Sequence, residues 1–195
     1  MLEQRIQQHF FESADLQYQV AEALARPVAG AAQVLVDGIT AGGRVMCCGH
    51  GLSSLDAHYM AALLLGRFEQ DRPALAAVAL GFDAQLSFDA GIDAGSILAR
   101  QVQALCHPGD ILMLFDAQQA GVGSLRELLT VAHAQDMTVI ALTGQLDDEL
   151  RAHLVETDVH IRVPHNRAAR VREIHRLLTH CLCDAVDLQL LGSGE

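Results

Sequence analysis

Apolar side chains recur at helical spacing along the first forty residues of the chain. Over Leu2–Ala25 they fall on one side of a helix, which predicts a long amphipathic helix. Pro27 lacks the backbone N–H that a helix interior needs, so the sequence predicts a break there. A second helix is expected over Val28–Thr40, ended by Gly42-Gly43.

Short apolar runs of strand length alternate with helical segments over the rest of the chain. We expect strands at Arg44–Cys48, Leu75–Leu80, Ile111–Phe115, Thr138–Leu142 and His160–Val163. We expect helices at Ser53–Leu65, Ile97–Leu105, Ser124–Ala134, Asp148–Leu154 and Ala168–Leu191. This alternation predicts an α/β fold, a three-layer sandwich with a five-stranded parallel sheet and helices on both faces. No linker or repeat is evident, so residues 1–195 are expected to form one domain, with 1–41 as N-terminal helices for oligomerisation and 44–191 as the sheet and its flanking helices.

The composition indicates a core of Leu, Ala, Val and Ile, because Trp is absent and only six Phe and two Tyr are present. The formal net charge of −11 at pH 7 opposes direct binding to nucleic acid. The densest basic segment, Arg162–Arg176, contains interleaved polar residues and is interpreted as a solvated helix face. The sequence shows no signal peptide and no apolar run of membrane-spanning length, so we expect a cytoplasmic protein without a membrane partner.

The five cysteines are interpreted as buried, reduced thiols. Their number is odd, Cys47-Cys48 lies within an expected strand, and Cys181-Leu182-Cys183 does not have the spacing of a CxxC pair. The sequence leaves a redox role for Cys47-Cys48 open.

A glycine-rich turn joins the first expected strand to its helix, with the sequence Cys48-Gly49-His50-Gly51-Leu52-Ser53. In such a turn, backbone N–H groups and often a serine hydroxyl face a bound anion. Gly49, Gly51 and Ser53 are therefore candidate ligand-binding residues. Ser53 has a second interpretation as the N-cap of its helix. Ligands of doubly wound folds lie at the carboxyl ends of the strands, where this turn would meet segments 116–123 and 143–146.

With these segments placed, nearly the whole chain resembles the sugar isomerase (SIS) domain family, in the branch of the phosphoheptose isomerases and the DnaA initiator-associating protein DiaA. The shared marks are Gly49-x-Gly51-x-Ser53, Asp56-Ala57, Gly66-Arg67-Phe68, Arg72-Pro73, Gly109-Asp110-Ile111-Leu112, the run 138–144, Ile161-Arg162-Val163-Pro164 and Glu173-Ile174-His175. The runs Cys47-Cys48-Gly49 and Cys181-Leu182-Cys183-Asp184 are similar to those of DiaA. The resemblance implies a flavodoxin-like SIS fold.

The resemblance also implies an isomerase site, from which this chain departs at three positions. The family's catalytic glutamate falls at Leu63, its metal-binding histidine at Tyr59 and its metal-binding glutamine at Arg172. Leucine cannot accept a proton, and arginine is a fixed cation that opposes a metal ion. Only His180 matches the family's remaining catalytic histidine, and it also fits an ordinary core residue. We therefore expect no catalytic residues, no metal and no cofactor.

The family's serine- and threonine-rich phosphate loop is replaced here by the segment from Asp116 to Ser124. Asp116 puts a negative charge where the resemblance places a phosphate. Ser124 either keeps a residual anion-binding role or caps its helix. The set His50, Asp56 and His58 is a weaker alternative for a metal, because no further ligand has matching spacing.

These departures favour a non-catalytic SIS adaptor over an enzyme. The resemblance to DiaA implies a homotetramer that binds the replication initiator DnaA and promotes initiation at the chromosomal origin. Leu190 and Leu191 precede the terminal Gly192-Ser193-Gly194 and are the expected partner-binding patch, unless they complete the subunit core. The alternative is a phosphoheptose isomerase-like or sugar-phosphate-binding protein with a degenerate site.

Overall fold

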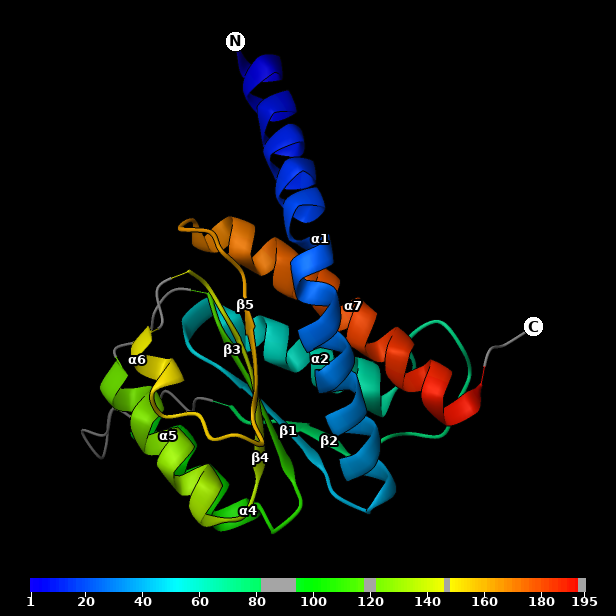
Figure 1. Cartoon of the computed structure of the whole chain (residues 1–195), viewed down its shortest axis with the longest axis vertical. Helices are drawn as coiled ribbons and strands as arrows, with labels where there is room; N and C mark the ends of the chain where they lie inside the picture. Colours follow the sequence, from blue (N-terminus) through cyan, green and yellow to red (C-terminus); the bar gives the residue numbers. More distant parts are fainter. Residues whose placement is uncertain (82–93, 118–121, 146–147, 193–195) are drawn as a thin grey trace.

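The protein is a five-stranded parallel sheet between two layers of helices, in the strand order β2-β1-β3-β4-β5 (Figure 1). The structure is a computed structural model that describes residues 1–81, 94–117, 122–145 and 148–192. The strands are β1 (Val45–Gly49), β2 (Ala77–Ala79), β3 (Ile111–Asp116), β4 (Thr138–Thr143) and β5 (Val159–Arg162). The helices are α1 (Leu2–Thr40), α2 (Ser54–Leu65), α4 (Ala94–Leu105), α5 (Val122–Ala134), α6 (Asp148–Arg151) and α7 (Ala168–Leu191), and a 3-10 turn, η1 (Gly51–Ser53), precedes α2. The α/β sandwich expected from the sequence is confirmed.

The two faces of the sheet are covered by different helices, because successive side chains of a strand point to opposite sides. Cys47 and Met113 lie in a core cluster with residues of α1, α2 and α7. Cys48 and Leu114 lie in a second cluster with residues of α4, α5 and α6. Burial on both faces explains why the strands are almost continuously apolar instead of alternating.

The helix break expected at Pro27 is wrong, because α1 continues through that residue without interruption. A proline inside a helix removes one hydrogen bond and crowds the preceding turn. Leu24 and Val28 beside it are buried against the sheet face, and α1 packs along α7. This packing outweighs the local preference. The buried positions of α1 run only from Leu16 to Val36, and its N-terminal part projects beyond the sheet (Figure 1).

The remaining expected elements are present, and their ends differ by up to three residues from those expected. Two expectations about the burial of side chains were wrong. Arg170, within the segment interpreted as solvated, is buried and contacts His9 and Glu173. Cys181 is exposed, whereas the other four cysteines are buried. No helix in the described part of the chain is long and apolar enough to span a membrane.

The guanidinium of Arg72 connects the end of α2 to α7. Its Nη1 and Nη2 donate hydrogen bonds to the carbonyls of Leu64 and Leu63, each at 2.8 Å, and its Nε donates to Asp187 Oδ1 at 2.5 Å. Both charged side chains are almost completely buried. A buried pair of this kind is costly to break from one side, because the remaining charge has no counterion.

Replacing Arg72 with Met should therefore destabilise the protein strongly. We expect Arg72→Met to lower the free energy of unfolding by about 3–5 kcal/mol, because Asp187 would be left buried and unpaired. Urea unfolding followed by circular dichroism measures the change. The matched control is Arg67→Met, since Arg67 pairs with Asp71 at the surface. The control should change stability by less than about 1 kcal/mol, and an equally small effect of Arg72→Met would contradict the assigned role.

Candidate functional site

The turn after β1 depends on two glycines. A Cβ on Gly49 would lie 2.4 Å from the carbonyl oxygen of Ser53, a distance that real side chains do not adopt. Gly51 has a φ of 56°, in the left-handed region that favours glycine. These two glycines therefore allow the turn to fold back tightly over the end of β1.

Ser53 braces two strand ends, and its interpretation as a helix cap is wrong. Its side chain makes no capping hydrogen bond to α2. Its buried hydroxyl accepts a hydrogen bond from the N–H of Ala117, which follows β3, at 3.1 Å. The hydroxyl thus holds the turn after β1 against the end of β3.

A pocket of about 440 Å³ opens beside this turn and is lined by Gly49, His50, Gly51, Ser54, His58, Gly81 and Leu98. It lies at the carboxyl end of β1, where the chain switches from one direction across the sheet to the other. Doubly wound folds bind their ligands at this switch point. We call it the glycine-turn pocket.

The glycine-turn pocket offers hydrogen-bond donors suited to an anion. The N–H group of Gly51 precedes the first hydrogen bond of η1, from Ser53 N–H to His50 O at 3.1 Å, so it has no partner within the turn. His50 Nδ1 is buried and has no hydrogen-bond partner in the described part of the chain. Nδ1 of His58 lies 2.8 Å from the carbonyl oxygen of Ser54, so this contact does not occupy Nε2, the second ring nitrogen.

Asp116 and Ser124 flank a segment of which the structure describes only the ends. Asp116 is the last residue of β3 and is buried, and its backbone carbonyl accepts a hydrogen bond from Gly144 N–H at 3.2 Å. Asp116 is not among the residues that line the glycine-turn pocket. Ser124 lies within α5, and its side chain is outside the described part. The expected role of the Asp116–Ser124 segment therefore stays a prediction.

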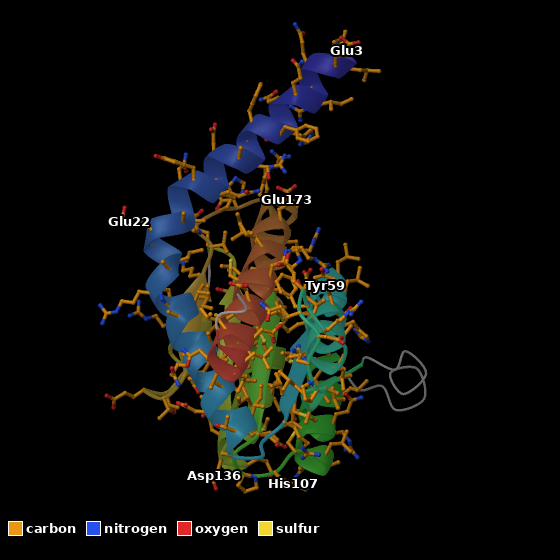
Figure 2. The ribbon with its side chains drawn as sticks, turned by 90° about the vertical axis from the view of Figure 1, so that its right-hand side faces the viewer. Glu3, Glu22, Tyr59, His107, Asp136 and Glu173 are labelled. Carbon is orange, nitrogen blue, oxygen red and sulfur yellow. The ribbon has the colours of Figure 1, made fainter. Side chains whose placement is uncertain are left out.

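The positions of the family's base and metal ligands meet where α2 packs against α7. Tyr59 and Leu63 are one turn apart on α2. Figure 2 shows Tyr59 toward the end of the molecule where α7 begins, opposite His107 and Asp136. The hydroxyl of Tyr59 lies 2.8 Å from Nε2 of His180. Leu63 is half-buried and packs against the core.

Two further side chains complete this contact, and sequence reasoning missed both. The guanidinium of Arg176 lies 3.8 Å from the centre of the Tyr59 ring and donates a hydrogen bond to Asp56 at 3.0 Å. Phe68 stacks on the His180 ring with centroids 5.5 Å apart. The available signal was spacing, because Arg172, Arg176 and His180 recur every four residues and so share one side of α7.

Burial raises the pKa of the Asp56 carboxyl, and the positive charges of Arg176 and Arg172 partly oppose this rise. The two arginines therefore serve as counterions to a carboxylate that the fold takes out of water. Asp56 and the two arginines leave one net positive charge at this end of α7.

This arrangement does not fit the metal ion that the family resemblance implies. Arginine has no lone pair to offer a metal, and the tyrosine hydroxyl is already paired with the one matching histidine. In the described part of the chain, no three His, Cys, Asp or Glu side chains are grouped as metal ligands. His50 and His58 line the glycine-turn pocket, whereas Asp56 faces Arg176.

His175 and the paired cysteines have structural roles. His175 is fully buried and contacts the Thr143 carbonyl at 3.4 Å, and burial lowers its pKa to about 4, so it is neutral at physiological pH. Burial raises the pKa of the Cys48 thiol to about 12 and also raises that of Cys47. Both thiols therefore stay protonated, in a form that reacts poorly.

The apolar pair at the end of α7 divides between the core and the surface. Leu190 packs against the core cluster of α1, α2 and α7. Leu191 is 45% exposed, and Leu188, one turn earlier, is 52% exposed. Leu190 and Leu191 thus do not form one exposed patch, but Leu188 and Leu191 lie on the same exposed side.

Comparison with known proteins agrees with this fold. The SIS domain family matches residues 8–144. A phosphoheptose isomerase of Methylibium petroleiphilum is 53% identical over 197 residues, covering 100% of this chain and 98% of the relative. A DnaA initiator-associating protein DiaA of Shigella flexneri is 38% identical over 191 residues, covering 95% of each chain.

Among solved structures, phosphoheptose isomerase GmhA from Neisseria gonorrhoeae superposes with a TM-score of 0.83 at 34% identity, covering 96% of this chain and 99% of that one. The overall identities favour the Methylibium isomerase over the Shigella DiaA, although the cysteine runs had pointed to DiaA. The chain belongs to the SIS domain family, in its group of phosphoheptose isomerases and DiaA proteins.

Proposed function

We propose that this protein binds a sugar phosphate in the glycine-turn pocket and does not isomerise it. The observation that carries the proposal is the contrast between two neighbouring regions. The turn with Gly49 and Gly51 and its pocket are intact, whereas the contact of α2 with α7 holds Leu63, Tyr59 and Arg172 instead of a base and metal ligands. The ligand class is taken from relatives named phosphoheptose isomerase.

Binding is supported by the donors of the pocket. A phosphate can accept hydrogen bonds from the N–H group of Gly51 and from a ring N–H of His50, whose buried Nδ1 has no partner in the described part of the chain. Asp116 is the nearby charge that opposes a dianion. It weakens the affinity without blocking entry, because it is buried and does not line the pocket.

Isomerisation is disfavoured by the lack of a base. Moving a proton between adjacent carbons requires a group that accepts the proton within hydrogen-bond reach. Leu63 cannot do so, and Nε2 of His180 is engaged by the Tyr59 hydroxyl. At the family's catalytic positions, proton transfer would thus have neither the carboxylate nor a free histidine.

A heptose phosphate should therefore bind without turnover. Isothermal titration calorimetry should give saturable binding, and His50→Leu should weaken it by about tenfold, or about 1.4 kcal/mol, because a pocket donor is lost. A coupled assay with zinc present should show no turnover, far from the roughly 1–1000 per second of typical enzymes.

The matched control is His107→Leu, because His107 is exposed and lies at the opposite end of the sheet (Figure 2). It should leave binding unchanged. Turnover by the wild-type chain would overturn the non-catalytic proposal, and no binding at millimolar ligand would overturn the assigned ligand class.

The metal site should be recoverable by restoring the family residues. The triple variant Tyr59→His, Leu63→Glu and Arg172→Gln supplies three donors beside His180 and removes a repelling cation, so it should retain about one zinc ion per chain. Elemental analysis after dialysis measures this. The wild type and the single variant Leu63→Glu should retain none, and zinc in the wild type would contradict the site described above.

A second candidate is the adaptor function of DiaA, supported by exposed apolar side chains. Leu2, Ile6 and Phe10 follow one another at one-turn spacing on the projecting part of α1, and each is more than half exposed. Such a stripe is typical of a surface that a second copy covers, which supports a homotetramer. The exposed Leu188 and Leu191 at the end of α7 would then offer one contact for DnaA on each copy of the chain. Such an adaptor would act in the cytoplasm.

Leu190 and Leu191 provide the test of this candidate, because only one of them is in the core. Leu191→Ala should weaken capture of purified DnaA several-fold with little change in melting temperature. Leu190→Ala should instead lower the melting temperature, since it removes core contacts. Light scattering of the wild type should give a tetrameric mass. A monomeric mass, or capture unaffected by Leu191→Ala, would contradict this candidate.

A further inference from the structure

A second pocket, of about 480 Å³, lies where α1, α2 and α7 meet. The two pockets open on different sides of α2, and this pocket shares no lining residue with the glycine-turn pocket. Its volume is many times the roughly 30 Å³ of one water molecule. Arg172, at the family's metal-ligand position, forms part of its wall, so we call it the Arg172 pocket.

The charged side chains of the Arg172 pocket are paired, with one exception. Arg176 donates to Asp56 at 3.0 Å, and Glu173 accepts a hydrogen bond from Arg170. Asp56 also attracts Arg172 electrostatically, yet Arg172 makes no hydrogen bond or ion pair with any residue in the described part of the chain. Its Nη1 is buried from solvent without a partner. Such a donor is costly unless a ligand satisfies it.

The charge balance of the pocket favours an anion over a cation. The Glu173–Arg170 pair is neutral, so Arg172 and Arg176 face the single carboxylate of Asp56. One positive charge is left uncompensated. The planar guanidinium presents parallel N–H groups that match the two oxygens of a carboxylate or a phosphate.

The rest of the wall suits a small organic molecule. Ser13 and Gln17 of α1 supply hydroxyl and amide groups, and Leu52 and Leu55 supply an exposed apolar rim. A ligand held at Arg172 by an acidic group could thus also make polar and apolar contacts. Pockets with a few convergent polar groups and apolar walls are typical of small-molecule sites.

We propose that the Arg172 pocket is an oxyanion site, which binds a small organic acid or phosphate ester through the guanidinium of Arg172. The substitution that removes a metal ligand thereby creates the recognition group for an anion. This site is separate from the glycine-turn pocket and does not depend on the function proposed for it.

Calorimetric titration of the full chain with two probes tests the proposal: inorganic phosphate and gluconate, each at constant ionic strength. At least one probe should bind with saturation. Arg172→Gln, which restores the neutral family residue, should weaken that binding at least about tenfold. Arg172→Lys, which keeps the charge but loses the parallel N–H donors of the guanidinium, should weaken it less. Binding of phosphate alone would assign the site to phosphate esters, and binding of gluconate alone to carboxylates.

Two controls separate this site from others. Arg126→Gln makes the same charge change on an exposed position of α5, across the sheet, and should leave binding unchanged. His50→Leu should leave binding in the Arg172 pocket unchanged, since His50 belongs to the glycine-turn pocket, and any phosphate binding that it removes belongs to the glycine turn. A probe lost in His50→Leu but kept in Arg172→Gln would locate the binding at the glycine turn and overturn the proposal.

Two other outcomes would also overturn it. The first is that neither probe binds the wild type at about 10 mM, well above the weak 1 mM range of small ligands. The second is that Arg172→Gln changes the mass in light scattering, because Arg172 would then pair with a second copy of the chain. Circular dichroism of each variant confirms that it is folded before its binding is compared.

Discussion

The buried guanidinium of Arg72 determines how α7 lies against α2, and the side chains between these helices depend on that contact. It holds the last carbonyls of α2 and the carboxylate of Asp187 on α7 at the same time. With both helices held in this way, Tyr59 meets His180 and Arg176 covers the Tyr59 ring. A small slide of α7 would separate these pairs, since hydrogen bonds weaken steeply with distance and angle.

Two pockets with different chemistry lie on either side of α2. The glycine-turn pocket draws on backbone N–H groups and imidazoles at the switch point of the sheet. The Arg172 pocket draws on a guanidinium that has no hydrogen-bond partner in the described part of the chain. The donors described in both pockets would suit an anion, although the chain as a whole carries a formal net charge of −11. Ligands at these pockets would therefore meet local donors that the net charge does not reveal.

The departures from the family pattern fall at the positions of its base and metal ligands and in the segment from Asp116 to Ser124 that replaces its phosphate loop. The glycines that shape the turn are kept, and so are the marks that build the sheet. Leu63 turns a base position into a packing position, and it is held by the core cluster of α1, α2 and α7. This pattern would result if catalysis were lost while the fold was retained, because different side chains are responsible for packing and for chemistry.

The sequence by itself determined the order of the elements and the α/β class. The apolar runs of β3 and β4 and the amphipathic α7 carry this information locally, and the expected bounds of α7 match the structure. The glycine turn could also be recognised in the sequence, because the positive φ of Gly51 favours glycine and only glycine tolerates the close approach at Gly49. Only the tertiary structure decided the unbroken path of α1 through Pro27, the buried state of Arg170 and the bond from Ala117 to the Ser53 hydroxyl. Each of these depends on residues far apart in the chain, whose packing and hydrogen bonds outweigh the local preferences that a sequence pattern records.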